Sequence, residues 1–267
     1  VGEDVQSGQI VIPQGKKIRP AEVGGLAALG IISITVSNKI KVGIISSGDE
    51  IIPPDQNPAP GQIRDINSFT LSSLILQNGG EPVRYGIIPD NFEALQQTAR
   101  RALSECHAVV ITAGSSASTR DMTASVIDSL GMPGVLVHGI NTRPGKPTIL
   151  GVVEGKPIIG LPGNPVSALV NGYLFVVPVL EKMSGQQMAH PRPVIKARLS
   201  VNLASQTGRE DWQPVRLVED NGTYKADPIF GKSNLIFTLV SADGMIKIHP
   251  DANGLSAGDW VDVHPIA

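Results

Sequence analysis

Carboxylates in the loops that follow predicted strands are the residues of this sequence best suited to chemistry. The five acids are Asp49, Glu50, Asp65, Asp90 and Asp121. Ligands of parallel α/β sheets bind beyond the carboxyl ends of the strands, so these loops are expected to converge at one edge. Converging carboxylates would hold Mg²⁺, which prefers oxygen ligands and keeps several waters. The pattern favours a site for a phosphorylated ligand with a divalent metal.

Each of these acids also has a structural interpretation. Asp90 and Glu93 have the spacing of a helix capping box, and so do Ser118 and Asp121. The two neighbouring acids after the first strand are compatible with solvated loop charge. Convergence at one sheet edge is what favours a functional role over these alternatives.

Basic residues occupy neighbouring loops. They are Arg64, Arg120, Arg143 and Lys146. Arg143-Pro144-Gly145-Lys146 places two cations close together on a loop that proline stiffens. Such a loop can pair with a polyanion, with Arg acting as a planar fork and Lys as a point charge. A solvated surface loop explains the same residues, and both interpretations stay open.

Two further loops combine small or rigid residues with hydrogen-bond donors for an anion. Gly114-Ser115-Ser116-Ala117-Ser118 leads into a predicted helix and offers N–H groups and hydroxyls to phosphate. It is not a Walker motif, since no Gly-Lys-Ser/Thr follows. In Leu161-Pro162-Gly163-Asn164-Pro165, a buried strand feeds a helix with Asn164 as N-cap and Pro165 at its first position. That helix start suits an anionic ligand, although a rigid, well-capped loop accounts for it equally.

Alternating strands and helices must position these loops. The apolar runs predict strands over 42–46, 83–88, 108–112, 135–140 and 157–161, and helices over 67–78, 92–105, 119–130 and 164–183, the last kinked at Pro178. Strands that alternate with helices of about a dozen residues predict a mainly parallel sheet covered on both faces, which is a three-layer α/β domain.

The segments on either side of this domain read differently. In the leader, we expect a hairpin around Pro13-Gln14-Gly15, a helix over 20–29 and a strand over 31–36. After Pro193, short strands are expected over 194–203, 211–217, 224–226, 235–237, 245–248 and 260–264, with Asn221-Gly222 as a hairpin turn. We therefore expect an N-terminal α+β remnant over 1–40, the α/β domain over 41–186 and an all-β domain over 187–267.

The composition excludes several classes of protein. A net charge of −2 gives no electrostatic footprint for nucleic acid, and no apolar run approaches the length of about 18 residues that a membrane helix needs. The single Cys106 excludes an internal disulfide and fits a reducing cytoplasm. Cys106 is interpreted as a packing residue, and the scattered His residues predict no zinc site. The chain starts at Val1 without an initiator Met and is expected to be a fragment.

The assembled motifs resemble those of the MoeA family, the molybdopterin molybdenumtransferases that include the E domain of gephyrin. The matching pieces are Ser46-Ser47-Gly48-Asp49-Glu50, Gly61-Gln62-Ile63-Arg64-Asp65-Ile66-Asn67, Gly86-Ile87-Ile88-Pro89-Asp90, Thr112-Ala113-Gly114 through Asp121, Pro144-Gly145-Lys146-Pro147 and Leu161-Pro162-Gly163-Asn164-Pro165-Val166-Ser167-Ala168. Their order and spacing agree over about residues 40–185. The leader and the tail resemble part of the family's first domain and its C-terminal β domain.

The resemblance implies insertion of molybdate into adenylylated molybdopterin, with Mg²⁺ and release of AMP, by a cytoplasmic homodimer. It assigns catalysis to Glu50, Asp90, Asp121 and Lys146, and the metal to the three acids. The substrate-binding residues that it implies are Ser47, Gly48, Asp65, Gly114, Ser115, Ser116, Ser118, Arg143, Pro162, Gly163, Asn164 and Pro165. Arg143 stands where relatives tend to have Lys.

Two departures from the family pattern qualify this expectation. The family's Gly-Gly-Val-Ser-x-Gly loop is replaced here by Ala113-Gly114-Ser115-Ser116-Ala117-Ser118, which has fewer glycines and more hydroxyls. The start of the first domain and the whole second domain are missing, so weak ligand binding and little turnover are expected. The alternatives are a molybdopterin adenylyltransferase, which shares the central domain but lacks the β tail, and a non-catalytic binding or scaffold module.

Overall fold

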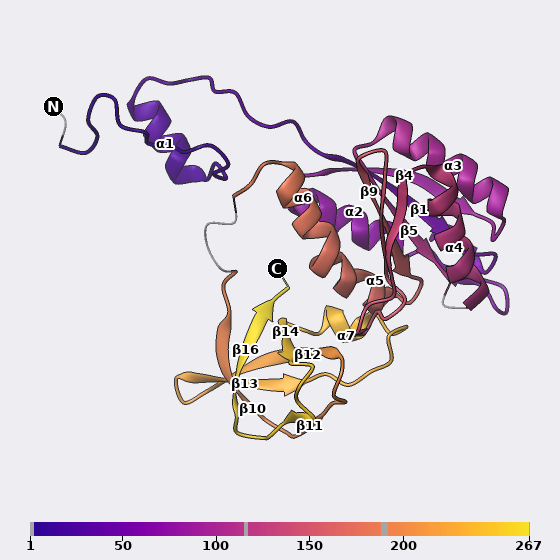
Figure 1. The fold of residues 1–267 in the computed structure, drawn as a ribbon. Coiled ribbons are helices and arrows are strands. Elements are labelled where there is room, and N and C mark those ends of the chain that lie inside the picture. The colour runs from indigo at the N-terminus through magenta and orange to yellow at the C-terminus, as the bar shows by residue number, and fades with distance from the viewer. Residues whose placement is uncertain (1–2, 115–116, 188–191, 267) are drawn as a thin grey trace.

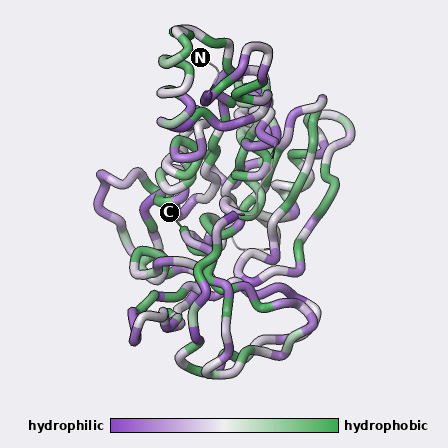
Figure 2. The backbone as a smooth tube through the Cα atoms, turned by 90° about the vertical axis from the view of Figure 1, so that its left-hand side faces the viewer, coloured by the Kyte–Doolittle hydropathy of each residue, from purple (hydrophilic) through white to green (hydrophobic). Residues whose placement is uncertain are grey.

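The computed structural model describes residues 3–114, 117–187 and 192–266, and side chains at all of these positions except 117–120. Figure 1 shows an α/β unit and a smaller β unit, joined side by side, with an N-terminal leader that extends away from the α/β unit. In Figure 2 hydrophobic and hydrophilic stretches alternate along the whole tube. Figure 1 shows the predicted difference between a mixed α/β part and a tail made mainly of strands.

The α/β unit is built on a six-stranded sheet with the strand order β4-β1-β5-β9-β8-β6. The strands are β4 (Glu81–Ile88), β1 (Lys41–Ser47), β5 (Ala108–Ala113), β9 (Lys156–Pro162), β8 (Ile149–Val153) and β6 (Pro133–His138). The first four pair in parallel, as predicted, and β8 is antiparallel to both of its neighbours. Strand β8 was not predicted from the sequence, although the Glu154-Gly155 turn that links it to β9 has the positive φ angles of a tight hairpin.

Helices pack on both faces of this sheet. One face carries α2 (Asn67–Gln77), α5 (Pro165–Asn171), the π-helical turn η1 (Gly172–Val176) and α6 (Val177–Met183), and the other carries α3 (Phe92–Glu105) and α4 (Ala117–Leu130). Successive strand residues point to opposite faces, so Ile44 packs with the first group of helices and Ile45 with the second. This double burial is what makes the strands read as continuous apolar runs in the sequence.

The segment Pro165–Met183 was predicted as one helix with a kink at Pro178. The segment is one continuous helical stretch, as predicted. Within it the wider η1 turn ends at Val176, and α6 has Pro178 in its first turn, where no backbone donor is needed. Within the described residues, this is the one helix long and apolar enough to cross a membrane by length and composition, and half of that stretch is buried inside the protein. Its contacts with Ile159 and Leu161 of β9 are those of a core helix.

The leader has the predicted helix, α1 (Pro20–Ala28), but neither of the predicted β elements. Residues 3–40 contain no strand, because the segment has no neighbouring strand with which to pair. Ile32 is 98% exposed as a result. Hydrogen bonds from Arg19 and Lys16 hold the pKa of the Glu22 carboxyl far below its ordinary value, and these contacts secure the start of α1.

The β unit is a closed barrel. Its sheet has the order β13-β10-β16-β14-β12-β7, and a further pairing of β12 with β13 closes it. The strands of this sheet are β10 (Ile195–Leu199), β12 (Glu210–Asp220), β13 (Thr223–Pro228), β14 (Gly244–Ile248), β16 (Trp260–Pro265) and β7 (Thr142–Arg143). Two short strands of the same unit, β11 (Leu203–Ala204) and β15 (Gly254–Leu255), pair with each other. In the α/β unit, β2 (Ile51–Ile52) pairs with β3 (Ile63–Arg64). The Asn221-Gly222 hairpin turn is confirmed, with positive φ at both residues.

One predicted strand of the tail is wrong. Residues 235–237 do not pair with any strand, and Phe237–Val240 forms the short helix α7 instead. A single helical turn is enough to bury Leu239 against α5, beside Val166 and Val170.

Candidate functional site

The loop that carries the predicted cations belongs to both units. Its residues Thr142 and Arg143 form β7, which pairs in parallel with Glu210 and Asp211 of β12. The N–H of Glu210 donates to the carbonyl of Asn141 at 2.9 Å, and the hydroxyl of Thr142 donates to the carbonyl of Glu210 at 3.1 Å. Backbone pairing therefore joins the two units and sets Arg143 opposite Asp211.

A large cavity lies at this junction. It has a volume of about 1240 Å³ and is lined by the loop 141–147, the start of α5, and loops and strands of the barrel. The charged residues that line it are Arg143, Lys146, Arg209, Lys232 and Asp211. Four cations with one carboxylate give this junction cavity an excess of positive charge among the described residues, which suits an oxyanion.

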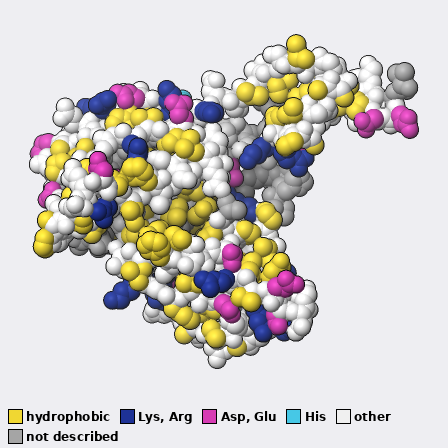
Figure 3. All heavy atoms as spheres, turned by 180° about the vertical axis from the view of Figure 1, so that it is seen from behind, with side chains coloured by type: hydrophobic (Ala, Val, Ile, Leu, Met, Phe, Trp, Pro, Cys, Tyr) yellow, Lys and Arg dark blue, Asp and Glu magenta, His cyan; other side chains and the backbone are white. Residues whose placement is uncertain are grey.

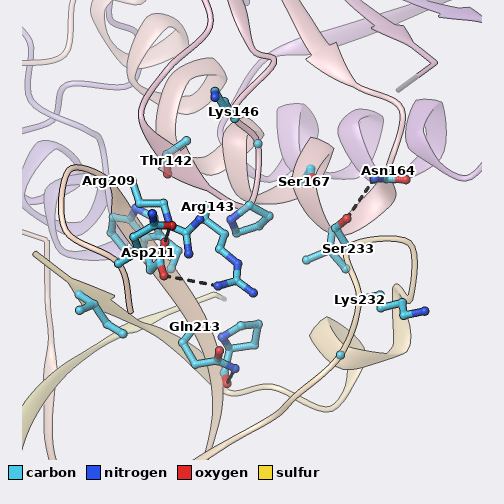
Figure 4. Close-up of a pocket in the computed structure, with 18 of the residues that line it drawn as sticks. Thr142, Arg143, Lys146, Asn164, Ser167, Arg209, Asp211, Gln213, Lys232 and Ser233 are labelled. Carbon is cyan, nitrogen blue, oxygen red and sulfur yellow. Dashed lines mark hydrogen bonds and ion pairs between the residues drawn. The ribbon is translucent and has the colours of Figure 1, made fainter. Parts of the chain in front are cut away.

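Asp211 organises the two arginines of the junction cavity. Its carboxylate is buried, with the residue 6% exposed. One oxygen lies 2.9 Å from Nε of Arg209, and the other lies 3.8 Å from Nη1 of Arg143 and accepts a hydrogen bond from the Ser205 hydroxyl at 2.8 Å. Figure 4 shows Arg143, Arg209 and Asp211 pointing toward one another. Both guanidinium groups thus lie beside one buried carboxylate at the cavity wall, and such planar forks match the geometry of an oxyanion.

The loop that presents Arg143 and Lys146 rests directly on helix α5. The fully buried Asn171 donates from Nδ2 to the carbonyls of Pro144, at 3.1 Å, and Ser167, at 2.8 Å. A Cβ on Gly145 would lie 1.7 Å from that same nitrogen, and Gly145 has a φ of +111°. Only glycine fits there, so the loop approaches the helix as closely as its backbone allows.

The start of α5 is also a contact between the units. Asn164 and Pro165 occupy the predicted N-cap and first helical positions, and Pro162 and Asn164 line the junction cavity. The Asn164 side chain caps no backbone group of the helix and instead donates to the Ser233 hydroxyl at 3.0 Å (Figure 4). The N–H of Val166 donates to the carbonyl of Ser233 at 3.0 Å. The prediction of N–H groups open to an anion is therefore wrong for Val166, whose donor is used by the barrel.

A Trp–His pair forms another part of the barrel wall. Trp212 lines the cavity, donates from Nε1 to Glu210 at 2.7 Å and meets the ring of His264 edge-on, with ring centroids 5.3 Å apart. Burial lowers the pKa of His264 below its ordinary value, and the positive charge of Lys247 adds to this effect. The neutral imidazole is thus the favoured form in the folded protein.

Part of the predicted acidic cluster assembles at the carboxyl ends of β1 and β4. The Ser47 hydroxyl donates to Oδ1 of Asp90 at 2.9 Å, and the N–H of Asp90 donates to Oδ1 of Asp49 at 3.1 Å. The predicted capping box of Asp90 with Glu93 is wrong, because Asn91 is the N-cap of α3 and accepts from the N–H of Ala94. Asp90 is therefore held at the neighbouring strand end.

The other predicted acids occupy different environments. Asp65 is buried and uses both carboxylate oxygens within the fold, accepting from the Ser46 hydroxyl at 3.0 Å and from the N–H of Ser68 at 3.1 Å. Glu50 folds back beside Gly48, where its Oε2 would lie 3.0 Å from an added Cβ. Asp121 is exposed on the first turns of α4. The described part of the chain holds no group of three or more His, Cys, Asp or Glu side chains able to bind a metal ion.

Gly114 is the described residue of the predicted phosphate-binding loop that precedes α4. Gly114 lies next to Gly163, where an added Cβ would be 2.8 Å from the carbonyl oxygen of Ala113. The predicted phosphate-binding residues Ser115 and Ser116, and the side chain of Ser118, lie outside the described residues. This close approach of Gly163 sets the turn after β9 against the end of β5.

Several residues that line the junction cavity or support its wall were not predicted from the sequence. They are Arg209, Asp211, Lys232 and Ser233 in the lining and Asn171, which holds the loop of Arg143. All but Asn171 come from the β tail, which was read as a separate module. The available signal was a cationic residue directly after a glycine, as in Gly208-Arg209 and Gly231-Lys232.

Two family models match the chain in the order of its two units. Residues 43–182 match the one described as "Probable molybdopterin binding domain". Residues 196–266 match the one described as "MoeA C-terminal region (domain IV)". These ranges correspond to the α/β unit and to the barrel, so the cavity lies where the two matched domains meet.

Relatives and a solved structure agree with these matches. A molybdopterin molybdenumtransferase of Haemophilus influenzae is 33% identical over 267 residues, covering 99% of this chain and 66% of that relative. One of Nostoc sp. is 34% identical over 86% of this chain and 54% of its own length. The molybdopterin biosynthesis MoeA protein of Pyrococcus horikosii superposes with a TM-score of 0.84 at 37% identity, over 98% of this chain and 63% of the other. The chain thus spans about two thirds of the length of the Haemophilus relative, and it belongs to the MoeA family of molybdopterin molybdenumtransferases.

Proposed function

We propose that this chain takes part in molybdenum cofactor biosynthesis by binding molybdate and adenylylated molybdopterin, so that molybdate is inserted with Mg²⁺ and AMP is released. The observation that carries this proposal is the junction cavity, where Arg143 and Arg209 converge around Asp211. Molybdate is a tetrahedral dianion, and planar guanidinium forks hold such oxyanions through paired N–H donors.

The cavity residues divide into charge carriers and supports. Arg143, Arg209, Lys146 and Lys232 supply positive charge, and the hydroxyls of Ser167 and Ser233 supply neutral donors from the facing wall. Asp211 holds the arginines, and Asn171 holds the loop that carries Arg143. A site built in advance in this way stabilises charge without reorganisation when the ligand arrives.

We place the phosphate groups of the substrate and Mg²⁺ at the acidic strand ends. Mg²⁺ commonly takes one or two protein carboxylates and completes its shell with substrate phosphates and water, so the Asp49 and Asp90 oxygens fit it chemically without a complete protein cage. Bound there, Mg²⁺ would neutralise the phosphoanhydride. The Ser47 hydroxyl orients Asp90, and Glu50 and Asp121 are the further acids of this proposal.

The barrel argues for this function over the adenylyltransferase alternative. Arg209, Lys232 and Ser233, which line the junction cavity, come from the part of the chain that matches the MoeA C-terminal region. An α/β unit alone would lack them. A homodimer and a cytoplasmic location belong to the same proposal.

Titration calorimetry with molybdate tests the cavity directly. Arg209→Ala is expected to weaken molybdate binding at least tenfold, because it removes one fork of the pair. Arg216→Ala removes an exposed arginine of β12, the strand that follows Arg209, at a position that does not line the cavity, and should leave the affinity unchanged. Equal affinity in Arg209→Ala and wild type would contradict the assignment.

Release of AMP tests the reaction and separates an enzyme from a binding module. With adenylylated molybdopterin, molybdate and Mg²⁺ supplied to the intact protein that contains this chain, Asp90→Ala and Asp121→Ala are expected to abolish metal-dependent AMP formation. Undiminished release from either variant would remove that acid from the catalytic set.

A further inference from the structure

Four apolar side chains are exposed beside the junction cavity. Phe230, Leu235, Phe237 and Val240 lie on and before α7, and Phe230 and Phe237 are 67% and 75% exposed. Figure 3 shows hydrophobic side chains gathered on the surface between the two units, at the level where α7 lies in Figure 1. Two phenyl rings in water beside a cationic cavity are unusual for a surface whose only ligand is a small inorganic anion.

The two phenylalanines differ in one decisive respect. Phe230 lines the junction cavity, together with Lys232 and Arg143, whereas Phe237 lies on α7 outside its lining. The same segment thus presents one aromatic ring to the cavity and a second, equally exposed ring to solvent.

The backbone around Phe230 is held on both sides. The N–H of Ile229 donates to the carbonyl of Pro214 at 2.9 Å, and the carbonyl of Ile229 accepts from the side chain of Gln213 at 2.7 Å. On the other side, an added Cβ at Gly231 would lie 2.3 Å from Cγ2 of Thr238, so the chain packs tightly against α7. The exposed ring therefore projects from a fixed position and not from a loose loop.

We propose that Phe230 is the stacking surface for a planar heteroaromatic ring that lies at the rim of the junction cavity, next to the oxyanion bound inside it. An aromatic rim continuous with a cationic interior suits a ring beside an oxyanion, because rings stack on phenyl faces while oxyanions pair with arginine and lysine. This inference rests on the proposed function, whose substrate carries two such rings, a pterin and an adenine. The chemistry of stacking is shared by both.

Binding measurements with three separate probes test the proposal. The probes are molybdate, AMP and a pterin monophosphate, each titrated into the chain and into the variants Phe230→Ala, Phe230→Tyr and Phe237→Ala. Phe230→Ala is expected to weaken at least one ring-bearing probe about tenfold, with molybdate unchanged. Phe230→Tyr, which keeps the ring face, should restore that affinity, and Phe237→Ala should change none of the three.

Which probes lose affinity identifies the ring that stacks on Phe230, and distinguishes failure of this inference from failure of the proposed function. A loss confined to AMP assigns the adenine to Phe230, and a loss confined to the pterin phosphate assigns the pterin. Unchanged affinity of Phe230→Ala for both ring-bearing probes, or an equal loss in Phe237→Ala, overturns the proposal even where wild type binds molybdate. Failure of wild type to bind molybdate, with the ring dependence intact, would instead count against the proposed function alone.

Discussion

Asp211 stands between two arginines that come from different units, with Oδ1 2.9 Å from Nε of Arg209 and Oδ2 3.8 Å from Nη1 of Arg143. Arg209 is two residues away in the barrel, and Arg143 belongs to the α/β unit. A single buried carboxylate thus fixes the cation pair and contributes to the contact between the units.

Removal of this negative charge should destabilise the protein. Asp211→Asn is expected to lower the free energy of unfolding by about 2 kcal/mol, because two arginines at a partly buried site lose their counter-charge. Urea denaturation measures the change. Asp262→Asn, which breaks the exposed Lys196–Asp262 pair on the same barrel, is the matched control and should cost less than about 1 kcal/mol. Equal losses in the two variants would contradict the role of Asp211.

The contact of Gly145 with Asn171 predicts a severe effect of one methyl group. Gly145→Ala places Cβ 1.7 Å from Asn171 Nδ2 and also strains a positive φ, so a loss of about 3 kcal/mol or more in stability is expected. Gly155→Ala has a positive φ but no neighbour within 4 Å, and should cost only about 1 kcal/mol. In Gly145→Ala/Asn171→Ala, removal of the amide makes room, so the double variant should lose less than the sum of the single ones. Simple additivity would show that the two residues do not contact.

The His264 ring should report on pH through its neighbour Trp212. Burial lowers the pKa of His264 below its ordinary value of 6.5, so its protonation in the folded protein is expected only below that pH. Because the folded state then binds fewer protons than the unfolded state, this contribution to stability is complete above about pH 6.5 and is lost as the pH falls. In Trp260→Phe, where Trp212 is the remaining tryptophan, fluorescence should change with a midpoint below 6.5. The same transition in a variant that also carries His264→Gln would disprove the assignment.

A negative charge introduced at position 164 should lower the affinity for molybdate more than it lowers the stability of the fold. Asn164→Asp can still accept a hydrogen bond from the Ser233 hydroxyl, so thermal stability should change little. The added negative charge would line the cavity proposed to bind molybdate, and molybdate affinity is expected to fall about tenfold or more. Asn164→Ser is the uncharged control. Comparable molybdate affinity in Asn164→Asp and Asn164→Ser would place the anion elsewhere.

The sequence predicts what depends on local chemistry and misses what depends on distant pairing. The helix over 92–105 and the Asn164-Pro165 helix start follow from spacing and capping, and both are confirmed. The pairing of Thr142 with Glu210 joins positions 68 residues apart. A strand of two residues has no sequence pattern from which its partner strand could be predicted. For that reason the sequence placed the cationic loop correctly at the edge of the sheet but not the barrel residues that complete its surroundings. The strand predicted in the leader is absent for a related reason, because its apolar residues have no neighbouring strand with which to pair.

The backbone pairing of β7 with β12 makes the junction cavity a property of neither unit alone. Because Arg143 is part of the barrel sheet as well as of the α/β unit, a rotation of one unit against the other must carry Arg143 with it or break the ladder that holds it. While this ladder holds, Arg143 and Arg209 keep their spacing whatever the angle between the two units. A change that breaks the pairing of Thr142 with Glu210 would separate the two guanidinium groups, even if it replaces no residue of the cavity.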